Sequence, residues 1–255
     1  MFANTSVLVT GAARGIGRAT AAAFAAADAR VALLDQDAAA VTSAADELRK
    51  SGRDVVALTA DVATSGEVND AIARVIRTWG ALDVLVANAG ISFARALDEY
   101  TDDEWNRILS VNLNGAFYAI RAALPHLKAR RGTVVLVSSM TGMVGQPRGA
   151  AYDASKGALI AMTRSLALEF APAGIRVNCV CPAGVDTPLM RSWADTLPDP
   201  RTVLQQQAEM HLLKRMATAD EIAAAILFLA SPAASFITGI ALPIDGGATL
   251  GYRRC

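Results

Sequence analysis

Two side chains suited to proton transfer, Tyr152 and Lys156, lie four residues apart in an Ala-rich segment. Side chains at this spacing share one face of a helix. A free phenol, with a pKa of about 10, is a poor base at neutral pH, but a nearby ammonium favours the phenolate. We therefore expect Tyr152 to exchange a proton with an alcohol or carbonyl oxygen, with Lys156 lowering its pKa.

Two further polar residues precede this pair. Ser139 lies 13 residues before Tyr152, after a Val-rich run, where its hydroxyl can hydrogen-bond a developing alkoxide or carbonyl oxygen. Ser138 is adjacent but would point the other way along a strand, so we assign the role to Ser139. Asn112 lies in a helical pattern although asparagine is a poor helix former, which indicates either a catalytic role or a polar residue that stabilises a kink.

A glycine-rich turn near the N-terminus predicts a pyrophosphate site. Gly11, Gly15 and Gly17 follow the apolar run Ser6–Thr10 and lead into an Ala-rich segment. Gly11 permits the sharp turn, Gly15 lets the backbone approach an anion, and Gly17 lets helix and strand pack closely. The start of the helix offers unpaired N–H groups and the positive end of its dipole to that anion.

Asp35 ends the second apolar run, about 20 residues after this turn. A carboxylate there accepts hydrogen bonds from the adenosine ribose and repels a 2′-phosphate, so NAD(H) is expected rather than NADP(H). A cap for the next helix is the alternative, and both roles can hold. Arg14, inside the turn, is the residue that could pair with a 2′-phosphate instead.

Short apolar runs alternate with longer amphipathic segments, which predicts an α/β fold with a parallel sheet covered on both faces. The expected strands are Ser6–Thr10, Arg30–Leu34, Val55–Thr59, Asp83–Ala87, Thr133–Ser138, Arg176–Val180 and Ile240–Ile244. The expected helices are Gly17–Ala27, Asp37–Ser51, Ser65–Trp79, Asp102–Lys128, Tyr152–Ala171 and Ala219–Ala230. No repeat or linker divides the chain, so residues 1–255 are expected to form one domain.

The segment from Pro188 to about residue 217 departs from this regularity, with three prolines and weak periodicity. A stretch of this length without strong structure is usually a lid or binding loop, so we expect it to cover the substrate. Two short surface helices without a role are the alternative.

Composition excludes several classes of protein. Lys plus Arg and Asp plus Glu each total 24 in 255 residues, so the formal charge is zero and no basic stripe suggests nucleic acid. No apolar run reaches the roughly 18 residues of a membrane span, and the N-terminus lacks an export signal. Three cysteines make no disulfide framework, and two histidines lack partners at metal-ligand spacing. A cytoplasmic protein without a catalytic metal is expected.

In combination, these motifs resemble the short-chain dehydrogenase/reductase family over nearly the whole chain. Asn112, Ser139, Tyr152 and Lys156 match its catalytic tetrad in order and spacing. The resemblance implies a doubly wound Rossmann fold whose seven-stranded parallel sheet has the order 3-2-1-4-5-6-7. It also implies that Lys156 binds the nicotinamide ribose and that Asn112 holds a water linking Lys156 to solvent.

The resemblance extends the dinucleotide site to three further stretches. Asp61-Val62 resembles the family's adenine-contacting pair, and Asn88-Ala89-Gly90 its Asn-Asn-Ala-Gly motif with the first Asn replaced by Ala87. Residues 181–187 resemble its Pro-Gly stretch beside the nicotinamide, interrupted here by Ala183. The residues expected to bind NAD(H) are therefore Gly11, Arg14, Gly15, Ile16, Gly17, Asp35, Gln36, Asp61, Val62, Asn88, Ala89, Gly90, Tyr152, Lys156, Pro182, Gly184, Val185 and Thr187.

The substrate is less defined, because function depends on the site rather than the fold. Arg148 and Arg191 lie near Tyr152 and at the start of the lid, where two guanidinium groups could grip a carboxylate; surface arginines are the alternative. With Val185–Pro188 they resemble dehydrogenases of small hydroxy acids. We expect oxidation of a secondary alcohol in a sugar acid of the 2-keto-3-deoxy-L-fuconate type. The expected substrate residues are Ser139, Arg148, Tyr152, Arg191 and Trp193.

Other activities stay open. They are a 3-hydroxybutyrate-type dehydrogenase, a sugar dehydrogenase, and a 3-oxoacyl-[acyl-carrier-protein] reductase, against which Asp35 argues because those reductases mostly carry basic residues there. A dinucleotide-binding regulator without catalysis is the alternative of another class, but such proteins commonly lose the tyrosine or the lysine.

The segments Asp102–Lys128 and Tyr152–Ala171 carry apolar residues on more than one face, among them Phe117, Tyr118, Leu166 and Phe170. Such helices must be buried inside the subunit or against a neighbour. The family commonly forms tetramers through these two helices, so a homotetramer is expected.

We expect Asp35→Ala to raise the KM for NAD⁺ on the order of tenfold or more, because the ribose loses hydrogen bonds to a charged acceptor. Steady-state kinetics at saturating alcohol measure this effect. An unchanged KM for NAD⁺ would refute the assignment of Asp35.

Overall fold

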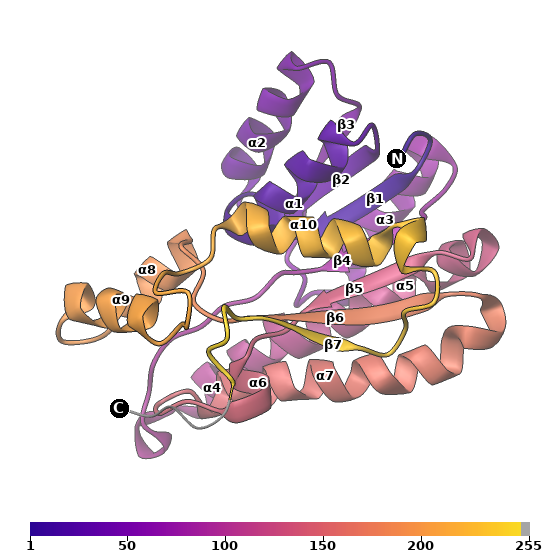
Figure 1. Cartoon of the computed structure of the whole chain (residues 1–255). Helices are drawn as coiled ribbons and strands as arrows, with labels where there is room; N and C mark the ends of the chain where they lie inside the picture. The colour runs from indigo at the N-terminus through magenta and orange to yellow at the C-terminus, as the bar shows by residue number, and fades with distance from the viewer. Residues whose placement is uncertain (251–255) are drawn as a thin grey trace.

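Within residues 1–250, which the computed structural model describes, seven strands pair in parallel in one sheet. The order is β3-β2-β1-β4-β5-β6-β7 (Figure 1), which confirms the expected topology. The strands are β1 Ser6–Thr10, β2 Arg30–Asp35, β3 Val55–Thr59, β4 Val84–Ala87, β5 Thr133–Val137, β6 Arg176–Pro182 and β7 Ala241–Ile244.

In the described part of the chain, ten α-helices and one π-helical turn connect these strands. They are α1 Gly15–Ala26, α2 Ala38–Lys50, α3 Ser65–Trp79, α4 Asp102–Leu109, the π turn Ser110–Asn114, α5 Gly115–Arg130, α6 Thr141–Val144, α7 Ala150–Phe170, α8 Pro188–Ala194, α9 Pro200–Glu209 and α10 Ala219–Ala230. Short 3-10 turns lie at Leu97–Glu99, Ala171–Ala173 and Pro232–Ala234.

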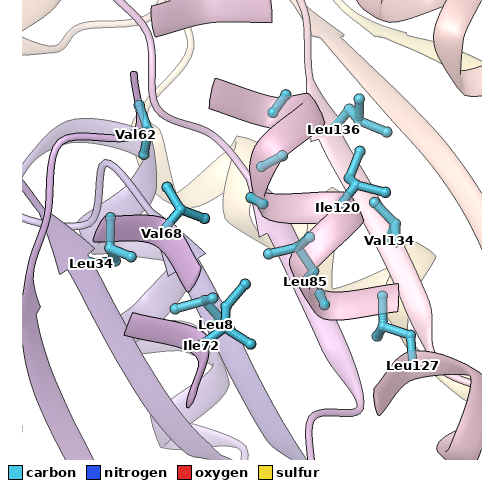
Figure 2. Close-up of a cluster of buried hydrophobic side chains, with 14 of the residues drawn as sticks. Leu8, Leu34, Val62, Val68, Ile72, Leu85, Ile120, Leu127, Val134 and Leu136 are labelled. Carbon is cyan, nitrogen blue, oxygen red and sulfur yellow. The ribbon is translucent and has the colours of Figure 1, made fainter. Parts of the chain in front are cut away.

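The sheet separates two apolar cores, because alternate strand residues point to opposite faces. On one face, Leu8, Leu34, Leu85 and Leu136 pack against α3, α5 and α7; Figure 2 shows the part of this core beneath α3 and α5. On the other face, Val7, Val9, Leu33 and Val135 pack against α1, α2 and α10. Since both faces are covered, the strands need apolar residues at nearly every position, as their sequences have.

Parallel pairing brings the carboxyl ends of all strands to one edge. Strand order reverses between β1 and β4, and a doubly wound sheet has its ligand crevice at this point. The turn after β1 and the segments after β4, β5 and β6 therefore meet at one place. The chemistry-bearing residues identified in the sequence lie at or after the ends of strands β1 to β6, in the π turn, and on α7 and α8.

One expected helix is interrupted. Residues 102–128 form α4, a π-helical turn over Ser110–Asn114, and α5. A π turn widens the helix by one residue and often marks a functional position. Asn112 lies in this turn, and its side chain bonds the backbone of Ile91 on both polar groups, which accounts for the break.

The segment after Pro188 contains more structure than its sequence indicated. Two of its prolines begin helices: Pro188 follows the capping side chain of Thr187, and Pro200 follows that of Asp199. Proline suits the first helical position because that N–H has no intrahelical partner. The resulting α8 and α9 project beyond the carboxyl end of β6 (Figure 1).

Residues 1–250 lack two features that would point to other classes of protein. No helix there has the length and apolar character needed to cross a bilayer. No group of three or more His, Cys, Asp or Glu side chains in the same residues is arranged to hold a metal ion.

Candidate active site

The glycine-rich turn can accept only glycine at two points. A Cβ on Gly17 would lie 2.1 Å from the carbonyl oxygen of Gly11, and a Cβ on Gly11 would lie 2.8 Å from Cα of Ala89. Gly11 and Gly15 have φ of 65° and 56°, a region that favours glycine. No side chain caps the start of α1, so its first N–H groups are left for an anion.

A clamp between β1 and β4 fixes this turn. The side-chain nitrogen of Asn88 donates to the carbonyl oxygens of Thr10 (2.8 Å) and Gly11 (3.1 Å). In return, the Thr10 hydroxyl accepts the backbone N–H groups of Asn88 and Ala89, both at 3.0 Å. Thr10 was not among the expected site residues. The available signal was a threonine that ends an otherwise apolar strand, directly before the glycine turn.

Two cavities flank Gly90 at the crevice. The Asp35 cavity is lined by Gly11, Asp35, Gln36, Asp61, Val62, Ala89 and Gly90, with Leu34, Ala60, Ile91 and Val111. The Tyr152 cavity is lined by Ile16, Asn88, Gly90, Ser139, Tyr152, Lys156, Pro182, Gly184, Val185, Thr187 and Trp193, with further residues named below. Two cavities that share Gly90, one lined by Gly11 and the other by Ile16 of the glycine turn, have the arrangement that an elongated dinucleotide requires.

Most of the expected site residues line one of the two cavities, and six do not. Those that line a cavity are given above, while Arg14, Gly15, Gly17, Asn112, Arg148 and Arg191 line neither. Asp35 faces its cavity with one carboxylate oxygen bound to the N–H of Ala13 and the other to that of Asp37, both at 3.1 Å. The helix cap considered for Asp35 is made by Asp37, which accepts from the N–H of Ala40.

Tyr152 and Lys156 share one face of α7, as their spacing predicted. The ammonium nitrogen of Lys156 lies 5.6 Å from the centre of the Tyr152 ring and donates to the carbonyl oxygen of Val137 at 2.8 Å. The Lys156 side chain is buried, whereas the accessible part of Tyr152 opens into the cavity. The end of β5 thus holds the ammonium beneath the phenol.

Burial shifts the pKa of both groups toward their neutral forms. It raises the pKa of Tyr152 to about 12, opposed in part by the hydrogen bond to Ser139 and assisted by the charge of Asp153. It lowers the pKa of Lys156 to about 8. The pKa of Tyr152 is therefore raised rather than lowered as we expected from Lys156, because desolvation by burial is the largest influence on the phenol.

The two serines have separate partners. Ser138 donates to the backbone carbonyl of Lys156 at 2.7 Å and so attaches α7 to β5. The Ser139 hydroxyl oxygen accepts from the N–H and the hydroxyl of Thr141, each at 3.2 Å, and hydrogen-bonds Tyr152. Ser139 is thus the serine that faces the phenol.

Asn112 connects three elements from its π turn. Its Oδ1 accepts from the N–H of Ile91 at 2.8 Å, and its Nδ2 donates to the carbonyl of Ile91 and to the Ser155 hydroxyl. Ser155 in turn donates to the carbonyl of Tyr152 at 2.6 Å. A Cβ on Gly90 would lie 3.3 Å from both Asn112 Oδ1 and Lys156 Nζ, so these atoms flank the same glycine.

The substrate end of the Tyr152 cavity mixes uncharged polar and apolar groups. The polar side chains are Ser92, Thr141, Gln146 and Gln207, and the apolar ones include Met140, Leu189, Met190 and Trp193. Within residues 1–250, Tyr152 and Lys156 are the only ionisable side chains that line it. Gln146 and Gln207 lie in segments that were expected to line the pocket, but neither was singled out, because a glutamine in a loop or on a polar helix face carries no signal of its own.

The two arginines expected to grip a carboxylate have other partners. Arg148 pairs with Glu99 at 2.6 Å, and Arg191 makes three hydrogen bonds to Asp186 at 2.9 to 3.2 Å. Both guanidinium groups are exposed, with 44% and 66% of their side-chain surface accessible. The structure therefore does not bring them to Tyr152, in agreement with the alternative of surface arginines.

The buried lysine makes stability depend on pH. Between pH 8 and 10.5, the folded and usual pKa values of Lys156, the unfolded chain binds more protons than the folded one, so the free energy of unfolding rises with pH. We expect wild type to gain about 1–2 kcal/mol over Lys156→Met between pH 7.5 and 9.5, measured by urea unfolding. Above pH 10 the raised pKa of Tyr152 acts in the opposite direction. A difference in unfolding free energy between wild type and Lys156→Met that stays constant from pH 7.5 to 9.5 would contradict the burial of the Lys156 ammonium.

Comparison with known proteins gives the same picture. A family model described as enoyl-(acyl carrier protein) reductase matches residues 11–249. An L-fucose dehydrogenase of Bos taurus is 39% identical over 254 residues, covering 99% of this chain and 92% of the relative. A meso-2,3-butanediol dehydrogenase of Serratia marcescens is 38% identical over 248 residues, covering 97% and 96%.

A solved structure shares the fold. The 3-ketoacyl-(acyl-carrier-protein) reductase of Brucella melitensis, complexed with NADH, superposes with a TM-score of 0.91 at 31% identity, covering 98% of this chain and 100% of its own. Sheet order, site and relatives therefore agree. The chain belongs to the short-chain dehydrogenase/reductase family and is an oxidoreductase that acts on CH–OH donors.

Proposed function

We propose that this enzyme uses NAD(H) to oxidise a secondary alcohol of a small neutral sugar or polyol. The observation that carries the proposal is the lining of the Tyr152 cavity: a phenol, an ammonium and a serine at its base, and only uncharged groups at its substrate end within the described residues. The relatives named for L-fucose and for butanediol act on uncharged alcohols, which supports the same class.

The two cavities fit a dinucleotide. The start of α1 and the glycine turn would hold the pyrophosphate, Asp35 the adenosine ribose, Asp61-Val62 the adenine, and Lys156 with the segment after β6 the nicotinamide half. Bound NAD⁺ supplies a hydride acceptor and a positive charge. That charge favours the phenolate of Tyr152 and so opposes the effect of burial on its pKa.

The protein's own residues then handle the proton. Tyr152 Oη accepts the proton of the substrate hydroxyl during oxidation and returns it during reduction. Ser139 hydrogen-bonds the substrate oxygen, where negative charge develops. Lys156, with a pKa of about 8, is mostly charged at neutral pH and stabilises the phenolate. Asn112 holds the π turn, the loop after β4 and α7 together, and is proposed to hold the water that links Lys156 to solvent.

The sugar-acid substrate expected from the sequence lacks a partner for its carboxylate in the described cavity. A carboxylate transferred from water to a site without a cation loses hydration that uncharged amides replace only in part. Gln146 and Gln207 instead offer both donors and acceptors to sugar hydroxyls, and Met140, Leu189, Met190 and Trp193 offer contact to an apolar part. A small neutral sugar with a methyl group has both features.

Helices α8 and α9 are proposed to act as the lid, over residues 188–217. Leu189, Met190 and Trp193 of α8 and Gln207 of α9 line the cavity, and α9 has no buried residue. The segment is fixed at both ends: Thr187 caps α8, and Ala217 pairs with Val185. We also propose a cytoplasmic location, because Cys179 and Cys181 are buried free thiols.

A substrate panel tests the proposal. We expect NADH formation from NAD⁺ with L-fucose, related neutral aldoses or C4 diols, and kcat/KM at least about tenfold lower with 2-keto-3-deoxy-L-fuconate and 3-hydroxybutyrate. Tyr152→Phe should lower kcat on the order of 10³-fold while NADH binding is retained. Preference for the acids, or for a 3-oxoacyl thioester with NADH, would overturn the neutral-substrate proposal, and full activity of Tyr152→Phe would overturn the proposed base.

We also infer a homotetramer assembled through α5 and α7. Phe170 is buried within the subunit, but Phe117 on α5 and Leu168 on α7 are exposed, at 44% and 80%. Light scattering after size exclusion should give about four times 26.6 kDa. A monomeric mass would exclude this assembly.

A further inference from the structure

Two arginines lie beside residues that line the Asp35 cavity, although neither arginine lines it, and each is paired with an aspartate. Arg14, from the glycine turn, forms an ion pair with Asp37. Arg107, from α4, pairs with Asp61 at 3.2 Å and also reaches the side-chain oxygen of Gln36 at 3.5 Å. An adenosine moiety in this cavity would therefore meet cations whose charge is already matched.

Asp37 is fixed from three directions. One carboxylate oxygen caps α2 by accepting from the N–H of Ala40 at 3.0 Å, and the other pairs with Arg14. Its own N–H donates to Asp35 at 3.1 Å, and the second oxygen of Asp35 accepts from the N–H of Ala13. Asp35, Asp37 and the turn that contains Arg14 thus form one bonded group.

Arg14 is the one arginine or lysine between Thr10 and Gly17, so it is the cation of the turn that could meet a 2′-phosphate. A guanidinium binds a phosphate through two parallel hydrogen bonds, and the same N–H groups cannot serve a carboxylate at the same time. The pair with Asp37 is exposed, with 57% and 42% of the side chains accessible, so it contributes little to stability. The pair engages one terminal nitrogen of Arg14 and places a carboxylate beside the guanidinium, which offsets the positive charge that a 2′-phosphate would otherwise meet.

We propose that Asp37 is a second determinant of coenzyme choice, which holds the Arg14 guanidinium in an ion pair and withholds it from a 2′-phosphate. This inference rests on the proposed dinucleotide site. It differs from the effect of Asp35, which repels the phosphate directly, because the effect of Asp37 requires Arg14.

The experiment compares Asp37→Asn in two backgrounds, with Arg14 present and with Arg14→Gln. Asparagine keeps the cap on α2, since it is as good a capping residue as aspartate. Fluorescence titration gives the Kd of NADH and of NADPH for each variant, and the ratio of the two is the readout. Asp35 is unchanged in every variant, so its repulsion is constant. Glu47→Gln is the matched control, because it removes another exposed ion pair between α1 and α2, that of Arg18 with Glu47.

We expect Asp37→Asn to shift the ratio toward NADPH by about two- to fivefold when Arg14 is present, and Arg14→Gln to abolish most of that shift. Glu47→Gln should leave the ratio unchanged. No shift in Asp37→Asn, or an equal shift with and without Arg14, would overturn the proposal. If wild type bound neither NADH nor NADPH, the dinucleotide site itself would be wrong, an outcome separate from these two.

Discussion

The buried ammonium of Lys156 is the constraint on which the site depends. Removing a charge from water is costly unless the protein offers compensating groups, and here the compensation is the carbonyl of Val137 at the end of β5. That carbonyl is available because the strand ends there, while Ser138 holds α7 in register by bonding the backbone of Lys156. The helix that carries Tyr152 is thus fixed relative to the sheet edge where the glycine turn lies.

The same burial makes the chemistry depend on a positive charge in the cavity. Desolvation raises the pKa of Tyr152 and lowers that of Lys156, so the phenol keeps its proton and the lysine holds its charge less firmly than in water. A positive charge placed beside the phenol reverses the first effect and not the second. The phenol is therefore the better base when such a charge is present, and it keeps the proton that it would donate when the charge is absent.

Sequence patterns predicted the parts of the fold that follow from local chemistry. The strands, the glycine turn and the shared face of Tyr152 and Lys156 follow from short-range periodicity and residue type, whereas the strand order followed from the family resemblance. The patterns failed where a contact joins distant residues: Glu99 lies 49 residues from Arg148, and the π turn at Asn112 depends on the backbone of Ile91. The prolines after Thr187 were misleading because proline both ends and begins helices.

The pairing of Arg148 with Glu99 is one of several arginine–carboxylate pairs that bear on selectivity. Four arginines that lie outside the lining of the two cavities are each paired with a carboxylate: Arg14 with Asp37, Arg107 with Asp61, Arg148 with Glu99 and Arg191 with Asp186. Each pair is weak as a source of stability because it is exposed. Together they leave no unmatched guanidinium among these four to attract a phosphate or a carboxylate. A crevice of this kind selects against extra negative charge at the cofactor end and at the substrate end by the same means.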